Sequence, residues 1–294
     1  MSMKDETSSR TLEPDEYVVN NEIQRRNGID ALELLQGSFG SEDTSDEQFL
    51  DVGCGPGDFT RDCLLPRCPP CRRIMAVDVS EDMVKYAREH FAHPKICYDV
   101  LDIASEDVSD FVERHGEFDR VYFFFCLHWM KDQATALKNV ARMIKPGGGC
   151  LLLFNASSPT TRFHKKMAAM DRWQKYKEIL EKPIPPSVDI MDKEALISYI
   201  KGLLRTADLT PTRCEVLRME HTFPNLENLI AVQMSYNLLK YVLTEEESPL
   251  LLKDVTEEST KWWAEKDAGD SPLDGQVFLV HAYKPRSPTV FTAM

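Results

Sequence analysis

Between residues 48 and 154, short apolar runs alternate along the chain with segments that are apolar on one side only. The apolar runs predict five strands, at 48–52, 73–77, 96–100, 118–125 and 150–154. The intervening segments predict helices at 59–65, 81–91 and 135–144. The run at 118–125 is largely hydrophobic at both sets of alternating positions, as a central parallel strand is. This alternation predicts an α/β fold built on a Rossmann-like, doubly wound parallel sheet.

The N-terminal segment precedes this alternating region and has a different pattern. Apolar side chains at positions 19, 23, 32 and 35 predict an amphipathic helix over residues 17–36. Residues 1–16 are polar and charged, which favours a disordered tail. The structured part of the chain is therefore expected to begin near residue 17.

The C-terminal part returns to strands only after a long helical stretch. Residues 156–204 are mostly helical in pattern, and two later runs, at 212–223 and 277–283, predict strands. Two such strands would complete a seven-stranded sheet. We therefore expect a single domain over residues 17–294, with helical cap elements at about 17–40 and 156–204.

Charge and hydropathy restrict the partners that this chain can have. The 35 Lys and Arg residues against 48 Asp and Glu residues give a formal net charge of −13, which disfavours nucleic acid and anionic membranes. The longest apolar run, at 121–130, is far shorter than a membrane helix, and the N-terminus has no apolar segment of the signal-peptide type. The composition predicts a cytoplasmic protein without membrane insertion and leaves its oligomeric state open.

The eight cysteines are expected to be reduced thiols in a cytoplasmic protein. Cys68 and Cys71 have the spacing of a metal-binding pair, and His90 and His93 follow them. Only two residues separate these histidines, whereas a zinc-finger pair has three to five, and no second Cys-x-x-Cys pair exists. The sequence therefore predicts no metal site.

The first predicted strand runs into an acidic residue and then a turn with three alternating glycines: Asp51, Gly53, Gly55 and Gly57. Glycine allows positive φ and leaves no Cβ between a ligand and the main chain. The order differs from the dinucleotide fingerprint, whose third glycine would fall at Asp58. An acid followed by this glycine pattern is typical of methyltransferases that depend on S-adenosyl-L-methionine (SAM). In that reading Asp51 helps to place the ammonium group of the cofactor.

Acidic residues also end the next two predicted strands. Asp78 offers two carboxylate oxygens, which suit the vicinal hydroxyls of a ribose. Asp102 is placed to accept a hydrogen bond from the adenine amino group, with Ile103 in apolar contact with the ring. Val79 and Met83 are expected to pack on the adenine as well. Because parallel strands end at one edge of the sheet, these residues predict a single SAM site.

The fourth predicted strand ends in a segment that holds His128 and Trp129. In a fold of this kind that position faces the transferred methyl group. The indole N–H of Trp129 can donate to an anionic acceptor without adding a competing charge. His128 is not assigned a catalytic role, because a carboxylate acceptor needs no general base.

Several segments together resemble the juvenile hormone acid methyltransferases of arthropods. Besides the glycine loop, they read NNEIQRR at 20–26, AVDVSEDMVKYA at 76–87, LHWMKDQ at 127–133 and CLLLF at 150–154. The resemblance covers roughly residues 17–154. It implies SAM-dependent O-methylation of the carboxylate of a small lipophilic acid, such as farnesoic acid or juvenile hormone acid. It also implies that Gln24 and Trp129 hold the substrate carboxylate.

Three alternatives remain beside this interpretation. A methyltransferase of another acid, such as a tricarboxylate, would require basic residues in the cap, where the sequence has Arg162, Lys165, Lys166 and Arg172. A protein that binds SAM without turnover would keep the same glycines and strand-end acids. A nicotinamide-dependent dehydrogenase is disfavoured by the missing third glycine and by the absence of a Tyr-x-x-x-Lys pair after the fifth strand.

Overall fold

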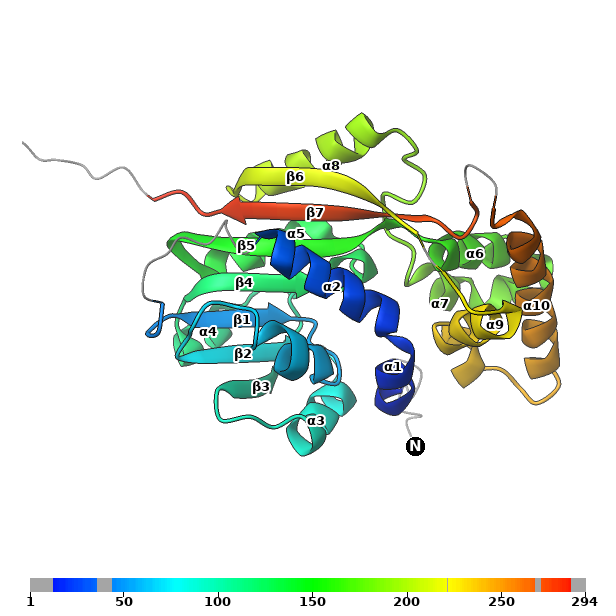
Figure 1. Ribbon diagram of the computed structural model, residues 1–294, viewed down its shortest axis with the longest axis horizontal. Helices are drawn as coiled ribbons and strands as arrows, with labels where there is room; N and C mark the ends of the chain where they lie inside the picture. Colours follow the sequence, from blue (N-terminus) through cyan, green and yellow to red (C-terminus); the bar gives the residue numbers. More distant parts are fainter. Residues whose placement is uncertain (1–12, 36–43, 221, 268–270, 287–294) are drawn as a thin grey trace, which may run out of the picture.

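The computed structural model describes residues 13–35, 44–220, 222–267 and 271–286. Its centre is a seven-stranded sheet with the strand order β3-β2-β1-β4-β5-β7-β6 (Figure 1). The strands are β1 (Gln48–Val52), β2 (Arg73–Asp78), β3 (Ile96–Val100), β4 (Phe118–Phe124), β5 (Ile144–Ser157), β6 (Thr210–Met219) and β7 (Gly275–Tyr283). The α/β fold and the seven-stranded sheet expected from the sequence are confirmed.

The direction of the strands places the site. β1 to β5 are parallel, whereas β7 runs antiparallel to both β5 and β6. The strand order reverses between β1 and β4, which pair side by side. In open α/β sheets ligands bind outside the carboxyl ends of the strands at such a reversal. The glycine loop after β1 and the segment after β4 lie at this point.

Helices cover both faces of the sheet because successive strand residues point to opposite sides. One face buries Leu50 and its neighbours under α5 (Gln133–Met143) and α8 (Lys193–Thr206). The other buries Phe49 and its neighbours under α2 (Glu22–Leu35). Two further helices, α3 (Glu81–His90) and α4 (Ser109–His115), flank the β2–β3 side.

A helical cap lies beyond the carboxyl ends of the strands (Figure 1). It contains α6 (Pro159–Ala168), α7 (Lys177–Glu181), α9 (Leu226–Ser235) and α10 (Ser248–Glu265). These helices share an apolar core of their own, separate from the apolar clusters that pack on the sheet. Inside it the indole N–H of Trp173 donates to Asp254 Oδ2 at 2.7 Å. The cap is therefore a second packed layer over the site.

The N-terminal segment differs from the single helix predicted at 17–36. It forms α1 (Pro14–Asn20) and α2, with a break at Asn21, whose side chain donates to Asp58 Oδ2 at 3.0 Å. A side chain that bonds outside its helix favours such a break. Most of the predicted disordered tail, 1–16, lies outside the described residues, but its last three residues begin α1.

The boundaries of the cap also differ from the prediction. Residues 193–206 form α8, which packs Leu196, Ile200 and Leu204 on the sheet rather than in the cap. Conversely, residues 226–265 supply α9 and α10 to the cap. The second half of α2 belongs to the sheet layer as well, and residues 36–40 lie outside the described residues. Apolar periodicity predicts a helix but not the layer in which the helix packs.

Smaller differences concern the helices around the sheet. The predicted helix at 59–65 contains a π-helical turn, Thr60–Leu64, a form that often occurs next to functional sites. The strand predicted at 150–154 is longer at both ends, because β5 covers Ile144–Ser157. Helix α4 was not predicted.

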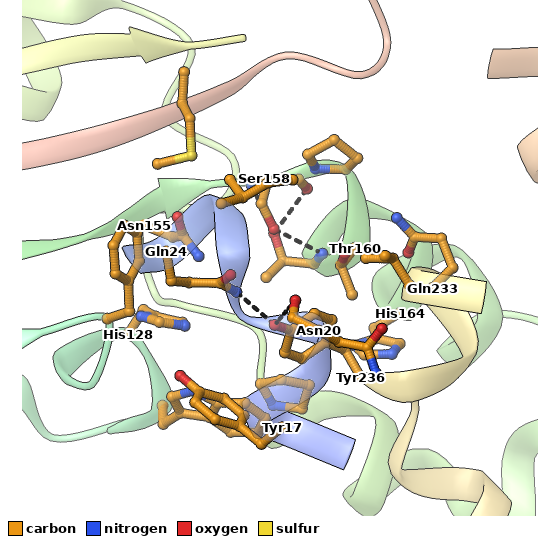
Figure 2. Close-up of a pocket in the computed structure, with 18 of the residues that line it drawn as sticks. Tyr17, Asn20, Gln24, His128, Asn155, Ser158, Thr160, His164, Gln233 and Tyr236 are labelled. Atoms are coloured by element: carbon orange, nitrogen blue, oxygen red, sulfur yellow. Dashed lines mark hydrogen bonds between the residues drawn. The ribbon is translucent and has the colours of Figure 1, made fainter. Parts of the chain in front are cut away.

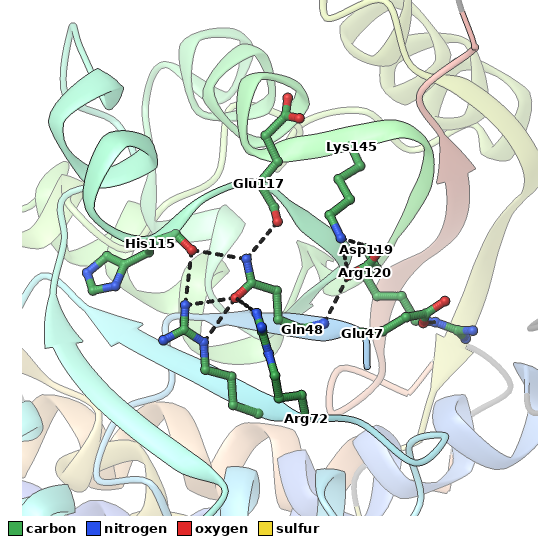
Figure 3. A network of polar contacts seen from close by, with 9 residues as sticks. Glu47, Gln48, Arg72, His115, Glu117, Asp119, Arg120 and Lys145 are labelled. Atoms are coloured by element: carbon green, nitrogen blue, oxygen red, sulfur yellow. Dashed lines mark hydrogen bonds and ion pairs between the residues drawn. The ribbon is translucent and has the colours of Figure 1, made fainter. Parts of the chain in front are cut away.

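A polar network joins the strands at the edge opposite the cap, where their amino ends lie (Figure 3). The buried amide of Gln48 donates to the carbonyl oxygens of His115 and Glu117 at 3.0 and 2.7 Å, and accepts from Arg73 at 2.8 Å. Asp119 accepts from the backbone N–H of Gln48 and pairs with Lys145. These bonds fix β1, β2 and β4 relative to one another. The amino ends of these strands therefore stabilise the sheet on the side away from the site.

Candidate functional site

The glycine loop after β1 has a shape that larger residues do not fit. Gly53 has φ of +74°, and a Cβ there would lie 2.3 Å from Cys126 Sγ. At Gly57, with φ of +86°, a Cβ would lie 2.8 Å from Ala87 Cβ. Such distances are well inside van der Waals contact. The glycines therefore let the loop pass close to the end of β4 on one side and to α3 on the other.

Asp78, at the end of β2, is hydrogen-bonded to this loop. One carboxylate oxygen accepts the backbone N–H of Gly55 and the other that of Ser80, each at 2.9 Å. Each oxygen keeps a second lone pair, which suffices for one ribose hydroxyl. Burial raises the pKa of Asp78 and the backbone N–H groups oppose that shift. The Asp78 carboxylate is therefore held in a fixed position and can still accept hydrogen bonds from a ligand.

A cavity of about 470 Å³ opens beside these groups, within the size range of small-molecule sites. Seven of the predicted cofactor residues line it: Gly53, Gly55, Asp78, Val79, Met83, Asp102 and Ile103. Acceptors at Asp78 and Asp102 and apolar side chains at Val79, Met83 and Ile103 fit the ribose and the adenine of SAM. The structure thus brings these seven residues together in one cavity, and their contacts with SAM stay a prediction.

Two predicted cofactor residues lie outside this cavity. Gly57 contacts the body of the fold and does not line it. Asp51 is 2% exposed, accepts from Thr60 Oγ1 at 2.6 Å and lines a smaller adjoining cavity with Gly53. Burial raises the pKa of Asp51 to about 7. Its assignment to the cofactor ammonium group stays a prediction.

SAM binding is expected to weaken as the pH falls below about 7, because a protonated Asp51 does not attract the ammonium group. The raised pKa means that the ligand-free carboxyl must release a proton on binding in that range. Calorimetric titration in two buffers of different ionisation enthalpy measures both effects. The Asp51→Asn variant should show a flatter dependence. A dissociation constant that is independent of pH in the wild-type protein contradicts this role.

Sequence reasoning missed a buried ion pair beside the loop. Asp58 is 2% exposed, forms an ion pair with Arg25 and accepts from the Asn21 amide at 3.0 Å. These partners are 33 and 37 residues away in the chain. The pair attaches the start of α2 to the turn that carries the glycines. In the sequence Asp58 only marked the absence of a dinucleotide fingerprint, but in the structure it positions the junction of α1 and α2.

The end of β4 also carries a strained residue. Phe125 has φ of +52°, a conformation that costs an ordinary residue about 1–2 kcal/mol. Its side chain lines the cofactor cavity, the smaller cavity and a third pocket. Tyr17 of α1 lines the same three and was not predicted as a site residue. Tyr17 and Phe125 therefore stand where the cavities meet.

The turn that follows, Leu127–Trp129, is held by the residues next to it. Asp132 caps α5 by accepting the backbone N–H of Thr135 at 2.9 Å. Gln133 donates to the carbonyl oxygen of Leu127 at 3.1 Å. The Asp and Gln of this sequence motif thus have structural roles, because they fix the turn that presents Trp129. Trp129 is half-buried and lines both the cofactor cavity and the third pocket.

The third pocket, here called the acceptor pocket, lies between the sheet and the cap (Figure 2). Among the described residues that line it, none is Asp, Glu, Lys or Arg. Its polar side chains include amides, hydroxyls and imidazoles: Tyr17, Asn20, Gln24, His128, Asn155, Ser158, Thr160, Thr161, His164, Gln233 and Tyr236. The pocket shares Tyr17, Phe125 and Trp129 with the cofactor cavity. A second ligand in it would therefore adjoin the cofactor.

Gln24 and Trp129, which the resemblance pairs, both line the acceptor pocket. The Gln24 amide donates to the Tyr236 hydroxyl at 2.8 Å, and that hydroxyl donates to the Asn20 carbonyl oxygen at 3.1 Å. One amide hydrogen of Gln24 is left for a ligand. His128 lines the same pocket, and burial lowers its pKa to about 3, so it is neutral at pH 7.

Basic side chains of the cap that could bind further carboxylates are engaged elsewhere. Arg162 donates to the carbonyl oxygens of Pro272 and Asp274 at 2.8 and 2.9 Å. Three others form ion pairs outside the pocket: Lys165 with Asp189, Lys166 with Glu258 and Arg172 with Asp254. The acceptor pocket therefore lacks the cationic lining that a tricarboxylate would need.

Within the described ranges, no three His, Cys, Asp or Glu side chains gather in a way that would hold a metal ion. In the same part of the chain, every helix is too short or too polar to cross a bilayer.

Comparison with known proteins also indicates a methyltransferase. Residues 50–152 match the family model described as a methyltransferase domain. The chain carries a class I methyltransferase domain. Its cofactor is SAM, in agreement with the cavity at Asp78.

Two curated relatives of this domain share one description, juvenile hormone acid O-methyltransferase. The protein from Drosophila melanogaster is 33% identical over 172 residues, which are 58% of this chain and 57% of that relative. The protein from Bombyx mori is 27% identical over 235 residues, or 79% of this chain and 82% of that relative. The alignment thus spans less than two thirds of the Drosophila protein. The predicted resemblance to this family is confirmed.

Solved structures support the fold alone, because their sequence identities are low. The Bacillus halodurans protein BH2331 superimposes with a TM-score of 0.52 at 20% identity, covering 88% of this chain and 99% of that chain. The cyclase SpnF gives a TM-score of 0.50 at 16% identity, covering 89% and 83%. Since a cyclase shares the fold, the acceptor chemistry has to be argued from the site.

Proposed function

We propose that this methyltransferase esterifies the carboxylate of a small lipophilic acid of the farnesoic or juvenile hormone acid type. The observation that carries the proposal is an acceptor pocket with uncharged polar lining that adjoins the cofactor cavity through Trp129. The names of the two curated relatives support the same class of substrate. The apolar side chains that line the pocket include Ile23, Phe125, Met219, Phe223 and Val232.

Neutral donors suit a carboxylate that has to react. A carboxylic acid is ionised at pH 7, since unperturbed carboxyls titrate near ~4. A lysine or arginine beside it would stabilise the anion before reaction and slow its attack. Gln24 and Trp129 can instead orient the oxygen by hydrogen bonds that add no charge. The pocket thus selects an anion without neutralising it.

Positioning supplies the remaining catalysis. SAM, when bound, supplies an electrophilic methyl group on a sulfonium centre. Because Tyr17, Phe125 and Trp129 line both cavities, a substrate in the acceptor pocket would lie next to SAM. The cap is held over the site in part by Lys131, which donates to the carbonyl oxygens of Glu181 and Ile184 at 2.6 and 2.7 Å. Proximity and exclusion of water are together sufficient for an in-line transfer that needs no general base.

The proposed function is tested by transfer of labelled methyl groups from SAM to a panel of acids. The panel contains farnesoic acid, juvenile hormone acid, shorter fatty acids and aconitate. We expect methyl esters of the lipophilic acids and none of aconitate, because the pocket offers no cation for a second carboxylate. Preferential methylation of aconitate would overturn the proposal. A protein that binds SAM but methylates none of these acids would instead support the non-catalytic alternative.

Gln24→Ala and Trp129→Phe are each expected to lower kcat/KM for the acid roughly tenfold, because each loses a hydrogen bond to a charged group. Affinity for SAM should stay within about twofold, since Asp78 and the glycine loop are unchanged. Steady-state kinetics and calorimetric SAM titration measure the two effects separately. Gln174→Ala and Trp263→Phe are matched controls, because both residues belong to the cap and neither lines the acceptor pocket. Wild-type turnover in both site variants would contradict the proposal that Gln24 and Trp129 hold the substrate carboxylate.

A further inference from the structure

Besides His128, whose Nδ1 is unpartnered within the described part of the chain, two buried side chains in the wall of the acceptor pocket lack the hydrogen-bond partners that such groups normally have. His164 on α6 is 1% exposed and Gln233 on α9 is 3% exposed. Among the described residues, neither ring nitrogen of His164 has a hydrogen-bond partner, and neither does Gln233 Oε1. Figure 2 shows them on the side of the pocket away from Gln24 and His128. The pocket therefore has a second polar region, remote from the expected carboxylate position.

Such an arrangement is costly unless a ligand completes it. Most buried polar atoms in folded proteins are paired, and an unpaired one is destabilising. Elsewhere in the cap, the buried indole N–H of Trp173 is paired with Asp254. Burial also lowers the pKa of His164 to about 4, so its imidazole is neutral and offers one donor and one acceptor. Gln233 offers a donor and an acceptor as well.

We propose that His164 and Gln233 form a second subsite, which binds a neutral oxygen of the substrate, such as a hydroxyl or an ether. This inference rests on the proposed function, which places the reacting carboxylate at Gln24 and Trp129. A second carboxylate would be a poor ligand here, because no cation lines the pocket to offset its desolvation. A purely hydrocarbon tail would leave the polar atoms unpaired. The pair therefore selects lipophilic acids that carry a polar group far from the carboxylate.

The test compares straight-chain acids from octanoic to tetradecanoic acid with their terminally hydroxylated forms. Dissociation constants are measured by calorimetry in the presence of S-adenosylhomocysteine, so the result does not depend on turnover. We expect the hydroxylated acid to bind roughly 3–10-fold more tightly than its parent at one chain length, as one net hydrogen bond provides. In an apolar pocket the hydroxyl would instead weaken binding. Parent acids that bind at least as tightly at every length would overturn the subsite.

Variants connect this preference to the two residues. His164→Leu and Gln233→Leu should each reduce or reverse the preference for the hydroxylated acid. Ser259→Ala is the matched control, because Ser259 is a buried cap residue whose Oγ has no partner among the described residues and which does not line the pocket. A preference that survives in both leucine variants would contradict the assignment. A preference without methyl transfer would refute the proposed function and leave the subsite standing.

Discussion

Replacement of Asp78 by alanine is expected to weaken SAM binding roughly 10–100-fold, since hydrogen bonds to a charged group contribute about 1.5–3 kcal/mol. Asp78 is the strand-end acid whose geometry is best defined, with one oxygen on the Gly55 N–H and the other on the Ser80 N–H. It lines the cofactor cavity beside Val79 and Met83. Isothermal titration calorimetry with SAM measures the change directly.

The same carboxylate also holds the glycine loop, so a second variant is needed to separate the two roles. Asp78→Asn keeps one acceptor oxygen and is expected to lose less affinity than Asp78→Ala. Asp82→Ala serves as the control, because Asp82 is an exposed residue of the following helix that does not line the cavity. Thermal unfolding shows whether each variant is folded. Unchanged SAM affinity in a folded Asp78→Ala protein would remove Asp78 from the site.

The sequence allowed the cofactor half of the site to be predicted because its residues directly follow strands. An apolar run that ends in Asp78 or Asp102 predicts both the strand and the place of the acid. Parallel strands then bring those ends to one edge without any knowledge of side-chain contacts. The cavity lining agrees with this reasoning for both acids. Local pattern is sufficient where the chain itself carries each residue to the site.

The acceptor half could not be predicted in the same way. Tyr17 lies on α1, His164 on α6 and Gln233 on α9, which Tyr236 directly follows, so these residues come from segments that are far apart in the sequence. Helical periodicity indicates which face is apolar but not which other helix will cover it. Gln24 was identified only through the family resemblance, and its bond to Tyr236 spans 212 residues. Long-range packing of the cap decides these contacts, and one sequence contains no direct signal for them.

Gly53→Ala is expected to destabilise the protein by about 2–5 kcal/mol and to abolish measurable SAM binding. The estimate adds about 1–2 kcal/mol for a side chain at positive φ to about 1–3 kcal/mol for overpacking. A Cβ at this position would lie 2.3 Å from Cys126 Sγ and 2.4 Å from Cys126 Cβ, so either the loop or the end of β4 must move. Thermal unfolding and SAM calorimetry measure the two losses.

Two further variants separate the backbone strain of a side chain at positive φ from the overlap of its Cβ with Cys126. Gly202→Ala, on α8 with nothing within 4 Å of its added Cβ, should raise stability by about 0.5–1 kcal/mol through helix propensity. Adding Cys126→Gly to Gly53→Ala removes both colliding atoms but leaves φ at +74°, so only part of the stability should return. If Gly53→Ala alone were as stable as the wild type and still bound SAM, the loop would not need to pass so close to β4. In that case the close approach of Gly53 to Cys126 would not be required for SAM binding.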